Sequence, residues 1–441
     1  MKKLILFGAG KSATCLIDYL IEQAPKYKWQ ITVIDADPLL ARAKVGKTVH
    51  VAVETYDIGN DEARGASIAD ADLVISLLPA ALHILVAKDC LRHKKSLLTA
   101  SYISPDIREL EKDIEHAGVL FMSEMGLDPG IDHMSAMKIL DSIRRKGGEV
   151  LSFKGYCGAL IAPECDDNPW RYKFSWNPRS VVLAGSAGAR YRINGKDMAV
   201  PYEKLFSDYK AVEIPGIGKM AYYPNRDSLH YASLYQMENV PTILRATLRY
   251  PEFCEGWQAL ISLGLTDPGK TTDTDKLTYS DWTLQSSGGT RHGNPEEKLA
   301  ASLHTSSRSR LMRQFKFLGL LDSETIALGK KTNADVLLQV LIEKLRMKPS
   351  DRDMIVMLHE MEFERKSIKT KLNSHLIVLG EDNLRTAIAK TVGLPLGILA
   401  KLLLTGKVQL TGLHIPVMPE VYQPVLKELE EYGIRFEESF S

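Results

Sequence analysis

The stretch LILFGAGKSATCL, residues 4–16, decides the fold of this chain. Residues 3–7 predict a short buried strand, residues 8–13 have the pattern G-x-G-x-x-A, and the residues from Thr14 onward have the apolar spacing of a helix. A strand, a glycine-rich turn and a helix in this order begin a dinucleotide-binding domain. We therefore predict a Rossmann-type turn.

Two other interpretations of the same stretch fail. A Walker phosphate loop, G-x-x-x-x-G-K-[ST], requires a glycine at the position where Ile5 stands. A secretory signal requires a longer apolar core than residues 4–7, which are soon followed by Lys11. The dinucleotide turn is the interpretation that fits all of these residues.

Each small residue of the turn has a role in this interpretation. Gly8 permits a tight turn, Gly10 lets the backbone approach a pyrophosphate, and Ala13 lets the helix pack closely on the strand. Unpaired amides at the helix N-terminus favour a negative ligand. The residues predicted to bind the cofactor here are Gly8, Ala9, Gly10, Lys11, Ser12 and Ala13.

Asp35 lies about twenty residues past the turn, at the end of a second predicted strand, residues 30–34. A carboxylate at this place accepts hydrogen bonds from the adenosine ribose and repels a 2′-phosphate. The sequence thus favours NAD, with NADP possible. The alternative, that Asp35 is only a turn residue before Pro38, stays open.

Composition limits the class of protein. The 441 residues suffice for two or three domains, and 45% hydrophobic with 25% charged residues indicates a soluble globular protein. With 56 basic and 55 acidic residues, the chain lacks the positive charge that nucleic-acid binding requires. No run approaches the roughly 18 apolar residues of a membrane helix, so we expect neither nucleic acid nor a membrane as a partner.

Five scattered cysteines without a C-x-x-C pair argue against a disulfide framework or a zinc ribbon. They suit a reducing compartment, and we expect a cytoplasmic location. His83 and His133 have no partners at metal-ligand spacing, so no metal site is predicted.

The alternation of strands and helices continues to about residue 122. Strands are expected at 70–79, 96–99 and 119–122, and helices at 81–93 and 103–118, the second with Ser104 as N-cap. This order predicts an α/β fold with a doubly wound parallel sheet, whose ligands bind at the carboxyl ends of the strands. The residues at those ends are Pro79, Ser101, Tyr102, Glu124 and Asp128.

The second part of the chain has a different pattern. Strands are expected at 149–160, 180–195, 244–250, 353–364 and 375–382, interrupted by a helical segment, and residues 384–406 predict an amphipathic helix pair that packs on the first domain. The expected division has three parts. They are a Rossmann domain (1–126, with 386–441), a mixed α/β substrate and dimerisation domain (127–255 and 351–385), and a helical insertion (256–350).

Seven motifs add a resemblance over essentially the whole chain. ASYISP (100–105), EMGLDPGIDHM (124–134), NPWRYKFSW (168–176), YYPNRDS (222–228), TLRY (247–250), DMIVM (353–357) and AKTVGLP (389–395) resemble, in order and spacing, the glutamate-forming saccharopine dehydrogenases. That family includes the C-terminal domain of the animal bifunctional aminoadipic semialdehyde synthase. The resemblance implies a dimer that reversibly oxidises saccharopine with NAD or NADP, giving 2-aminoadipate 6-semialdehyde and glutamate.

The resemblance also implies site residues. Saccharopine carries three carboxylates, which the planar fork of arginine pairs well. Substrate residues implied by the family motifs are Ser101, Tyr102, Arg226, Thr247 and Arg249, although a surface ion pair is the alternative for each arginine. Cofactor residues implied in the same way are Leu77, Leu78, Pro79, Leu127, Asp128, Pro129 and Ser175.

The general acid or base is left open by the sequence. Asp128, Tyr102 and Cys157 are candidates by position. An ordinary aspartate is too acidic for the task, an ordinary tyrosine or cysteine is too basic, and a water molecule is a further alternative.

The chain departs from the family pattern at Ala159, Ile161 and Ala246, where relatives often have Gly, Pro and Gly. These changes leave room for another opine-like secondary amine, such as a carboxylated polyamine. An alternative of another class is a non-catalytic dinucleotide-sensing protein.

Overall fold

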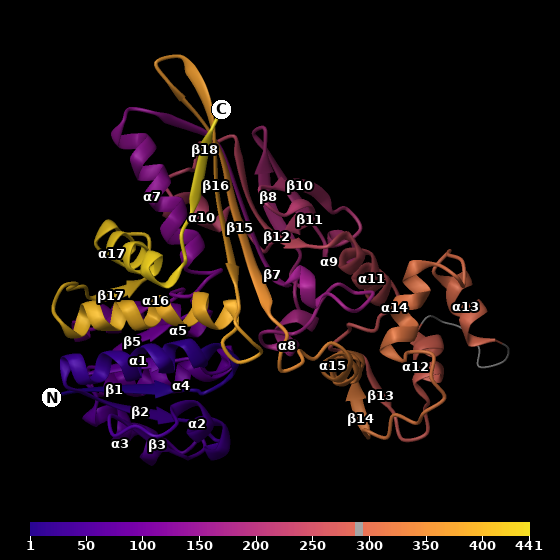
Figure 1. Cartoon of the computed structure of the whole chain (residues 1–441), viewed down its shortest axis with the longest axis horizontal. Helices are drawn as coiled ribbons and strands as arrows, with labels where there is room; N and C mark the ends of the chain where they lie inside the picture. The colour runs from indigo at the N-terminus through magenta and orange to yellow at the C-terminus, as the bar shows by residue number, and fades with distance from the viewer. Residues whose placement is uncertain (287–293) are drawn as a thin grey trace. The chain divides into compact units, whose positions relative to one another are not determined.

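The computed structural model describes residues 1–286 and 294–441. The chain forms two compact units, each built from separate stretches of sequence. Unit 1 comprises Met1–Glu149 and Leu376–Glu437, and unit 2 comprises Val150–His375 and Glu438–Ser441. Figure 1 follows the chain through both.

Unit 1 contains a seven-stranded sheet in the order β17-β6-β5-β4-β1-β2-β3. All six strand pairs in it are parallel, with β1 (Lys2–Phe7) between β2 (Trp29–Ile34) and β4 (Leu73–Ser76). The first six strands have the Rossmann order, which reverses at β1. The predicted doubly wound parallel sheet is confirmed.

Two strands of this sheet were not expected from the sequence. β3 (Val51–Glu54) and β17 (Gly412–His414) are both edge strands, of four and three residues. The partner of β17 is β6 (Leu120–Met122), almost 300 residues earlier in the chain. A pairing of so few residues over such a separation has no local signal. The remaining strand is β5 (Ser96–Thr99).

The helices of unit 1 cover this sheet. Residues 103–118 form two short helices that meet at Leu110 rather than the single helix expected, and the Ser104 hydroxyl caps the first, as predicted, at 3.4 Å from the Ile107 amide. Unit 1 also continues past residue 126 through α7, where Tyr422 of α17 donates to Asp141 at 2.7 Å. The helices are α1 (Thr14–Tyr27), α2 (Pro38–Val45), α3 (Asp61–Asp70), α4 (His83–Arg92), α5 (Pro105–Glu109), α6 (Glu111–Ala117), α7 (Ile131–Arg145), α16 (Ala387–Leu404) and α17 (Pro419–Leu429).

The expected helix pair at 384–406 is wrong, because α16 is one helix that continues through Pro395. It lies along α1, where a Cβ atom on Gly393 would stand 2.8 Å from the Leu16 amide nitrogen (Figure 1). Burial of both halves against unit 1 keeps the helix continuous across the proline. α16 is long and apolar enough to cross a membrane, but 72% of it is buried inside the chain, as in a core helix.

Unit 2 is built on a nine-stranded mixed sheet. Its main path is β10-β11-β12-β7-β15-β16-β18, with β8 pairing to β12 and β9. β12 runs parallel to β7 and antiparallel to β11. The strands are β7 (Glu149–Ile161), β8 (Ala189–Ile193), β9 (Lys196–Val200), β10 (Lys210–Ile214), β11 (Gly218–Pro224), β12 (Thr242–Arg249), β15 (Asp353–Arg365), β16 (Ile368–Leu379) and β18 (Glu437–Phe440).

The strand expected over residues 180–195 is wrong in its first part. Pro178–Val182 is the short helix α8, since Asn177 caps it by accepting from the Arg179 amide at 3.0 Å and proline occupies the first turn. Only β8 is a strand.

Helices of unit 2 share a core with its sheet. Trp170, Trp257 and Trp282 are at most 1% exposed in a cluster that also includes Tyr223 of β11. The helical segment is therefore part of unit 2. Its elements are α11 (Pro251–Ser262), β13 (Thr271–Asp273), α12 (Tyr279–Ser286), α13 (Pro295–Ser302), α14 (Arg310–Leu318), β14 (Lys330–Thr332) and α15 (Asn333–Lys344), and the short helices α9 (Tyr202–Leu205) and α10 (His230–Leu234) precede it.

Candidate active site

The glycine turn of unit 1 has the geometry of a nucleotide loop. Gly8 has φ +99°, and a Cβ atom there would stand 2.8 Å from the carbonyl oxygen of Leu77. Gly10 is different, because among the described residues, its own chain neighbours apart, no heavy atom lies within 4 Å of the place of its Cβ. Glycine is thus required at Gly8 by the protein itself, whereas open space at Gly10 leaves room for a ligand to approach the backbone.

The helix that follows presents uncapped amides. The 3-10 turn Lys11–Ala13 leads into α1, and neither Gly10 nor Ala13 provides a side-chain cap. Ala13 is buried, and Lys11 is exposed. A helix N-terminus without a side-chain cap, with its dipole, fits the pyrophosphate of a dinucleotide.

Asp35 joins the end of β2 to this turn. Its Oδ2 accepts from the Ala9 amide at 2.6 Å, and its Oδ1 accepts from the Asp37 amide at 2.9 Å. The turn role and the ribose role are compatible, because a carboxylate has further lone pairs. Beside it, Lys44 Nζ donates to the Gly10 carbonyl oxygen, and burial lowers the pKa of Lys44 to about 8, against the attraction of Asp35.

The residues after β4 close the other side of the turn. The Leu77 amide donates to the Phe7 carbonyl at 2.8 Å, so Leu77 extends the sheet next to the glycine turn. Leu77 and Leu78 are half-buried, and Pro79 is exposed. This position is consistent with both a core role and a cofactor role for the two leucines.

Tyr102 and Asp128 form a pair at the carboxyl edge of the sheet of unit 1. The Tyr102 hydroxyl donates to Asp128 Oδ1 at 3.2 Å. Asp128 belongs to the Leu127-Asp128-Pro129 turn, whose Asp128–Pro129 peptide is cis. It is the one residue between 121 and 137 that is not buried.

Glu124 lies at a strand end, as expected, but is buried. Its Oε2 is 2.9 Å from His133 Nε2, and its Oε1 accepts from the Ile103 amide at 3.4 Å. Glu124 is 5% and His133 0% exposed. This pair fixes the segments that carry Tyr102 and Asp128 rather than facing a ligand.

In unit 2, Arg249 is a buried cation at the end of β12. It is 4% exposed, and its guanidinium carbon lies 5.3 Å from the ring centre of Tyr172 and 5.4 Å from that of Phe253. Its Nη1 donates to the Leu248 carbonyl at 2.8 Å, and its Nε has no partner. Among residues 1–286 and 294–441, no carboxylate forms an ion pair with Arg249. Burial lowers the pKa of Arg249, but Tyr223, Tyr172 and two cysteines raise it by more, so the group stays charged.

Thr247 and Cys157 lie close to this arginine. The two residues are register partners on β12 and β7, and Cys157 is buried. Cys157 is among the groups that raise the pKa of Arg249. The structure therefore brings three of the expected residues together on one sheet.

Two other expected residues of unit 2 lie in loops. Arg226 is exposed, with φ +52°, in the segment after β11, and its carbonyl accepts from the Arg190 amide at 2.9 Å. Ser175 is 3% exposed in the NPWRYKFSW segment.

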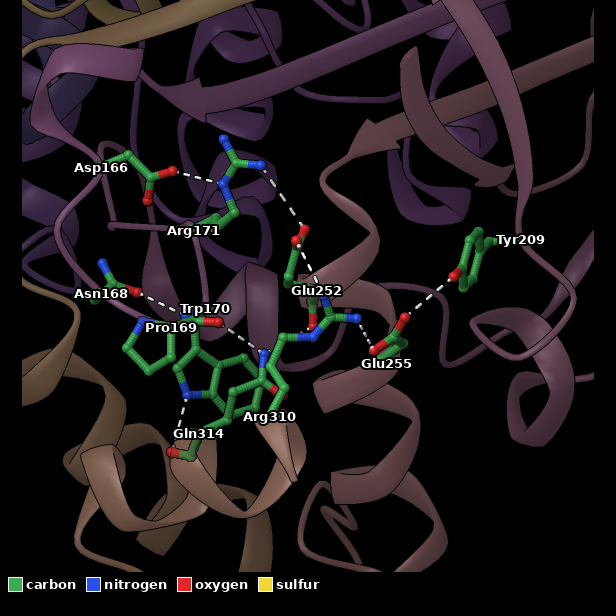
Figure 2. Close-up of polar contacts among 10 residues, drawn as sticks. All are labelled: Asp166, Asn168, Pro169, Trp170, Arg171, Tyr209, Glu252, Glu255, Arg310 and Gln314. Carbon is green, nitrogen blue, oxygen red and sulfur yellow. Dashed lines mark hydrogen bonds and ion pairs between the residues drawn. The ribbon is translucent and has the colours of Figure 1, made fainter. Parts of the chain in front are cut away.

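A polar network anchors the NPWRYKFSW segment (Figure 2). Trp170 Nε1 donates to the Gln314 carbonyl of α14 at 3.1 Å, and Gln314 Nε2 donates back to the Pro169 carbonyl at 3.0 Å. Arg171 pairs with Asp166 at 2.6 Å and with Glu252 of α11 at 3.9 Å, and Glu252 pairs with Arg310 of α14 at 3.2 Å. The segment that places Tyr172 against Arg249 is thus tied to two helices.

One polar contact was missed by sequence reasoning. His83, considered there only as a metal ligand, lies between two serines, one of which is the expected substrate residue Ser101 at 2.7 Å. The contact depends on sheet pairing and has no local pattern. Within the described parts of the chain, no group of three or more His, Cys, Asp or Glu side chains is placed to hold a metal ion.

Comparison with known families gives two matches that together span nearly the whole chain. Residues 4–122 match the saccharopine dehydrogenase NADP binding domain, and residues 126–434 match the saccharopine dehydrogenase C-terminal domain.

Individual relatives give the same result. The chain is 36% identical over 450 residues to "Saccharopine dehydrogenase [NADP(+), L-glutamate-forming]" of Saccharomyces cerevisiae, covering 99% of both chains. It is 35% identical over 444 residues to the mitochondrial alpha-aminoadipic semialdehyde synthase of Bos taurus, covering 99% of this chain but 47% of that protein. The chain thus spans about half the length of the animal synthases that it matches.

A solved structure supports the fold. The apo histidine-tagged saccharopine dehydrogenase (L-Glu forming) from Saccharomyces cerevisiae matches with a TM-score of 0.89 and 34% identity, covering 100% of both chains.

Proposed function

This chain belongs to the saccharopine dehydrogenase family, and we propose that it catalyses the reversible, NAD(P)-dependent oxidation of saccharopine. Saccharopine, the oxidised dinucleotide and water would give 2-aminoadipate 6-semialdehyde, glutamate, the reduced dinucleotide and a proton. The relatives named for this activity include one that the chain covers almost completely.

The observation that carries the proposal is the buried, unpaired charge of Arg249. A guanidinium taken out of water and left without a counter-charge is costly, so this position is suited to an anion that arrives with the ligand. A substrate carboxylate supplies that anion and two acceptor oxygens. A substrate with several carboxylates, such as saccharopine, fits this requirement.

Proton transfer is assigned to the residues of unit 1. A bound nicotinamide would accept the hydride, which is the chemistry that the dinucleotide supplies. The Asp128 carboxylate, which accepts from the Tyr102 hydroxyl, would take the proton of the secondary amine or of the hydrolytic water. Cys157 remains a further candidate, in unit 2.

The preference for NAD over NADP is also a proposal. It is supported by the position of the Asp35 carboxylate at the end of β2, against the glycine turn. The matching domain and the yeast relative carry NADP in their names and do not support the preference. An Asp35→Arg variant should lose the preference for NAD in binding titrations, and unchanged affinities for both dinucleotides would show that Asp35 does not contact the ribose.

Three further expectations remain proposals. The family resemblance suggests a homodimer, which light scattering of the purified chain tests. The five cysteines are all free, which suits a reducing compartment such as the cytoplasm. A small-molecule substrate, without nucleic acid or a membrane, is consistent with the near-neutral charge and the burial of α16.

The deciding experiment is an assay with saccharopine and each dinucleotide. The purified protein should produce the absorbance of the reduced nicotinamide, and no signal with either dinucleotide would contradict the proposal. A panel of other secondary amines, including a carboxylated polyamine, tests the alternative substrate. Dinucleotide binding in calorimetry without turnover of any amine would instead indicate a sensing protein.

A further inference from the structure

A chain of three polar side chains runs through the carboxyl end of the sheet in unit 1. Ser76, the last residue of β4, has its Oγ 2.8 Å from His83 Nδ1. His83, the first residue of α4, has its Nε2 2.7 Å from the Oγ of Ser101, just after β5. Ser76 and His83 are 0% and 2% exposed, whereas Ser101 is half-buried.

The Ser76 hydroxyl determines which nitrogen of His83 carries the hydrogen. Within residues 1–286 and 294–441, its one hydrogen-bond partner is His83 Nδ1. If Nδ1 carried the hydrogen, the buried Ser76 hydroxyl would have no acceptor, which costs about 1–3 kcal/mol. Nδ1 is therefore the acceptor, and a neutral imidazole then carries its hydrogen on Nε2.

The state of Ser101 follows from that of His83. Nε2 donates to the Ser101 oxygen, so the Ser101 hydroxyl hydrogen must point away from the histidine. Thr99 Oγ1 lies 3.4 Å from the same nitrogen and already accepts from the Ser101 amide at 3.2 Å, which is compatible with Nε2 as a donor. Burial lowers the pKa of His83 to about 4, so the ring is neutral near pH 7.

We infer that His83 is a positioning residue, which with Ser76 holds the Ser101 hydroxyl as a donor to an acceptor oxygen of the substrate, most simply a carboxylate. The inference rests on the proposed function, since it takes the bound molecule to be a carboxylated amine. With the opposite tautomer, Ser101 would present lone pairs to the carboxylate and repel it. Ser76, which does not touch the substrate, thus sets the direction of the hydrogen bond that Ser101 makes to it.

The tautomer is tested without any turnover. Nitrogen NMR of the full chain labelled with 15N-histidine distinguishes a protonated from an unprotonated ring nitrogen, and His83 is identified by the signals lost in His83→Gln. We expect Nδ1 unprotonated and Nε2 protonated from about pH 6 to about pH 8, where an ordinary histidine titrates. Hydrogen on Nδ1, or a charged ring in this range, would overturn the inference.

Kinetics test the effect on the substrate. His83→Leu and Ser101→Ala should each raise the KM for saccharopine about tenfold with a smaller change in kcat, and the double variant should be no worse than either. His83→Gln should recover most of the loss, because its amide can donate from the place of Nε2. The exposed His116→Leu is the matched control and should change neither constant.

Additive effects of the two variants, or no recovery with glutamine in a protein that melts normally, would overturn the inference. If the unmodified protein does not turn over saccharopine, the proposed function fails, while the nitrogen spectrum still decides the tautomer.

Discussion

The glycine turn of unit 1 and the buried Arg249 of unit 2 both suit anions, but by opposite means. The turn offers backbone amides beside open space at Gly10, where water replaces an absent ligand at little cost. Arg249 is buried, with its charge near the rings of Tyr172 and Phe253, where bulk water solvates it poorly. An exposed donor set suits a cofactor that exchanges freely, and a buried charge suits selection of one carboxylated substrate.

The largest expected effect lies in neither anion site. Asp128→Asn should lower kcat about 10³-fold, because it removes a general base from the Tyr102 pair. Calorimetry of the same variant measures separately whether Asp128 also contacts the dinucleotide, as the family motif implies. A kcat within tenfold of the unmodified protein would assign the proton transfer to another group.

Arg249→Leu should weaken substrate binding without changing dinucleotide binding. The loss of a buried charge contact corresponds to about 3 kcal/mol, or roughly a 10²-fold fall in kcat/KM for saccharopine. Dinucleotide affinity should not change. Without substrate, the free energy of unfolding should fall by no more than about 1 kcal/mol, because an uncompensated charge is also removed.

The matched control for this change is Arg192→Leu, which removes an arginine of unit 2 already paired with Asp197 at 2.7 Å. It should leave kcat/KM unaltered. A strong loss of thermal stability in Arg249→Leu would mean that the guanidinium supports the fold rather than the substrate.

Gly8→Ala should weaken dinucleotide binding without changing the residues around Arg249. The added Cβ meets the Leu77 carbonyl and forces a non-glycine residue to φ +99°, a strain of roughly 1–3 kcal/mol. We expect about a tenfold weaker affinity for the dinucleotide in calorimetry. Gly118→Ala is the control, since Gly118 has φ +66° and no neighbour within 4 Å, and equal losses in both variants would exclude a specific role of the turn.

The smallest expected effect is that of the Lys44 ammonium on dinucleotide affinity, and it should depend on pH. Below its pKa of about 8 the ammonium attracts the phosphates of the dinucleotide, and above it the charge is lost. Affinity should therefore fall about threefold as the pH rises through this range, and Lys44→Gln should abolish the fall. An identical pH profile in the variant would show that Lys44 does not face the phosphates.

The parts of the fold that the sequence predicts are those with a local signal. The strand, turn and helix around Gly8 follow each other directly, and the Ser104 cap lies three residues from its amide partner. β17 is not predicted because its partner β6 lies far away in the sequence, and β3 is not predicted because it is a four-residue edge strand with only one buried residue. The continuity of α16 through Pro395 is not predicted from the sequence, because burial and not helix propensity decides it.

The site residues also fall into those that a sequence motif marks and those that only the structure reveals. Family motifs single out Arg249 and Asp128, but only the structure shows that Arg249 is buried without a carboxylate and that Asp128 is the half-buried residue of a buried segment. His83 has no such motif, since its partners Ser76 and Ser101 come to it from two different strands. Contacts made across a sheet depend on register, which a single sequence does not reveal.

The position of β17 has a consequence for the order of synthesis. The first 149 residues leave the ribosome with the edge of β6 unpaired and with the face of α1 that receives α16 uncovered. Both are covered only after some 250 further residues have been made, among them those of unit 2. An exposed apolar helix face and an open strand edge are the surfaces that chaperones bind and that aggregate. A nascent chain interrupted within unit 2 is therefore the species of this protein most in need of protection.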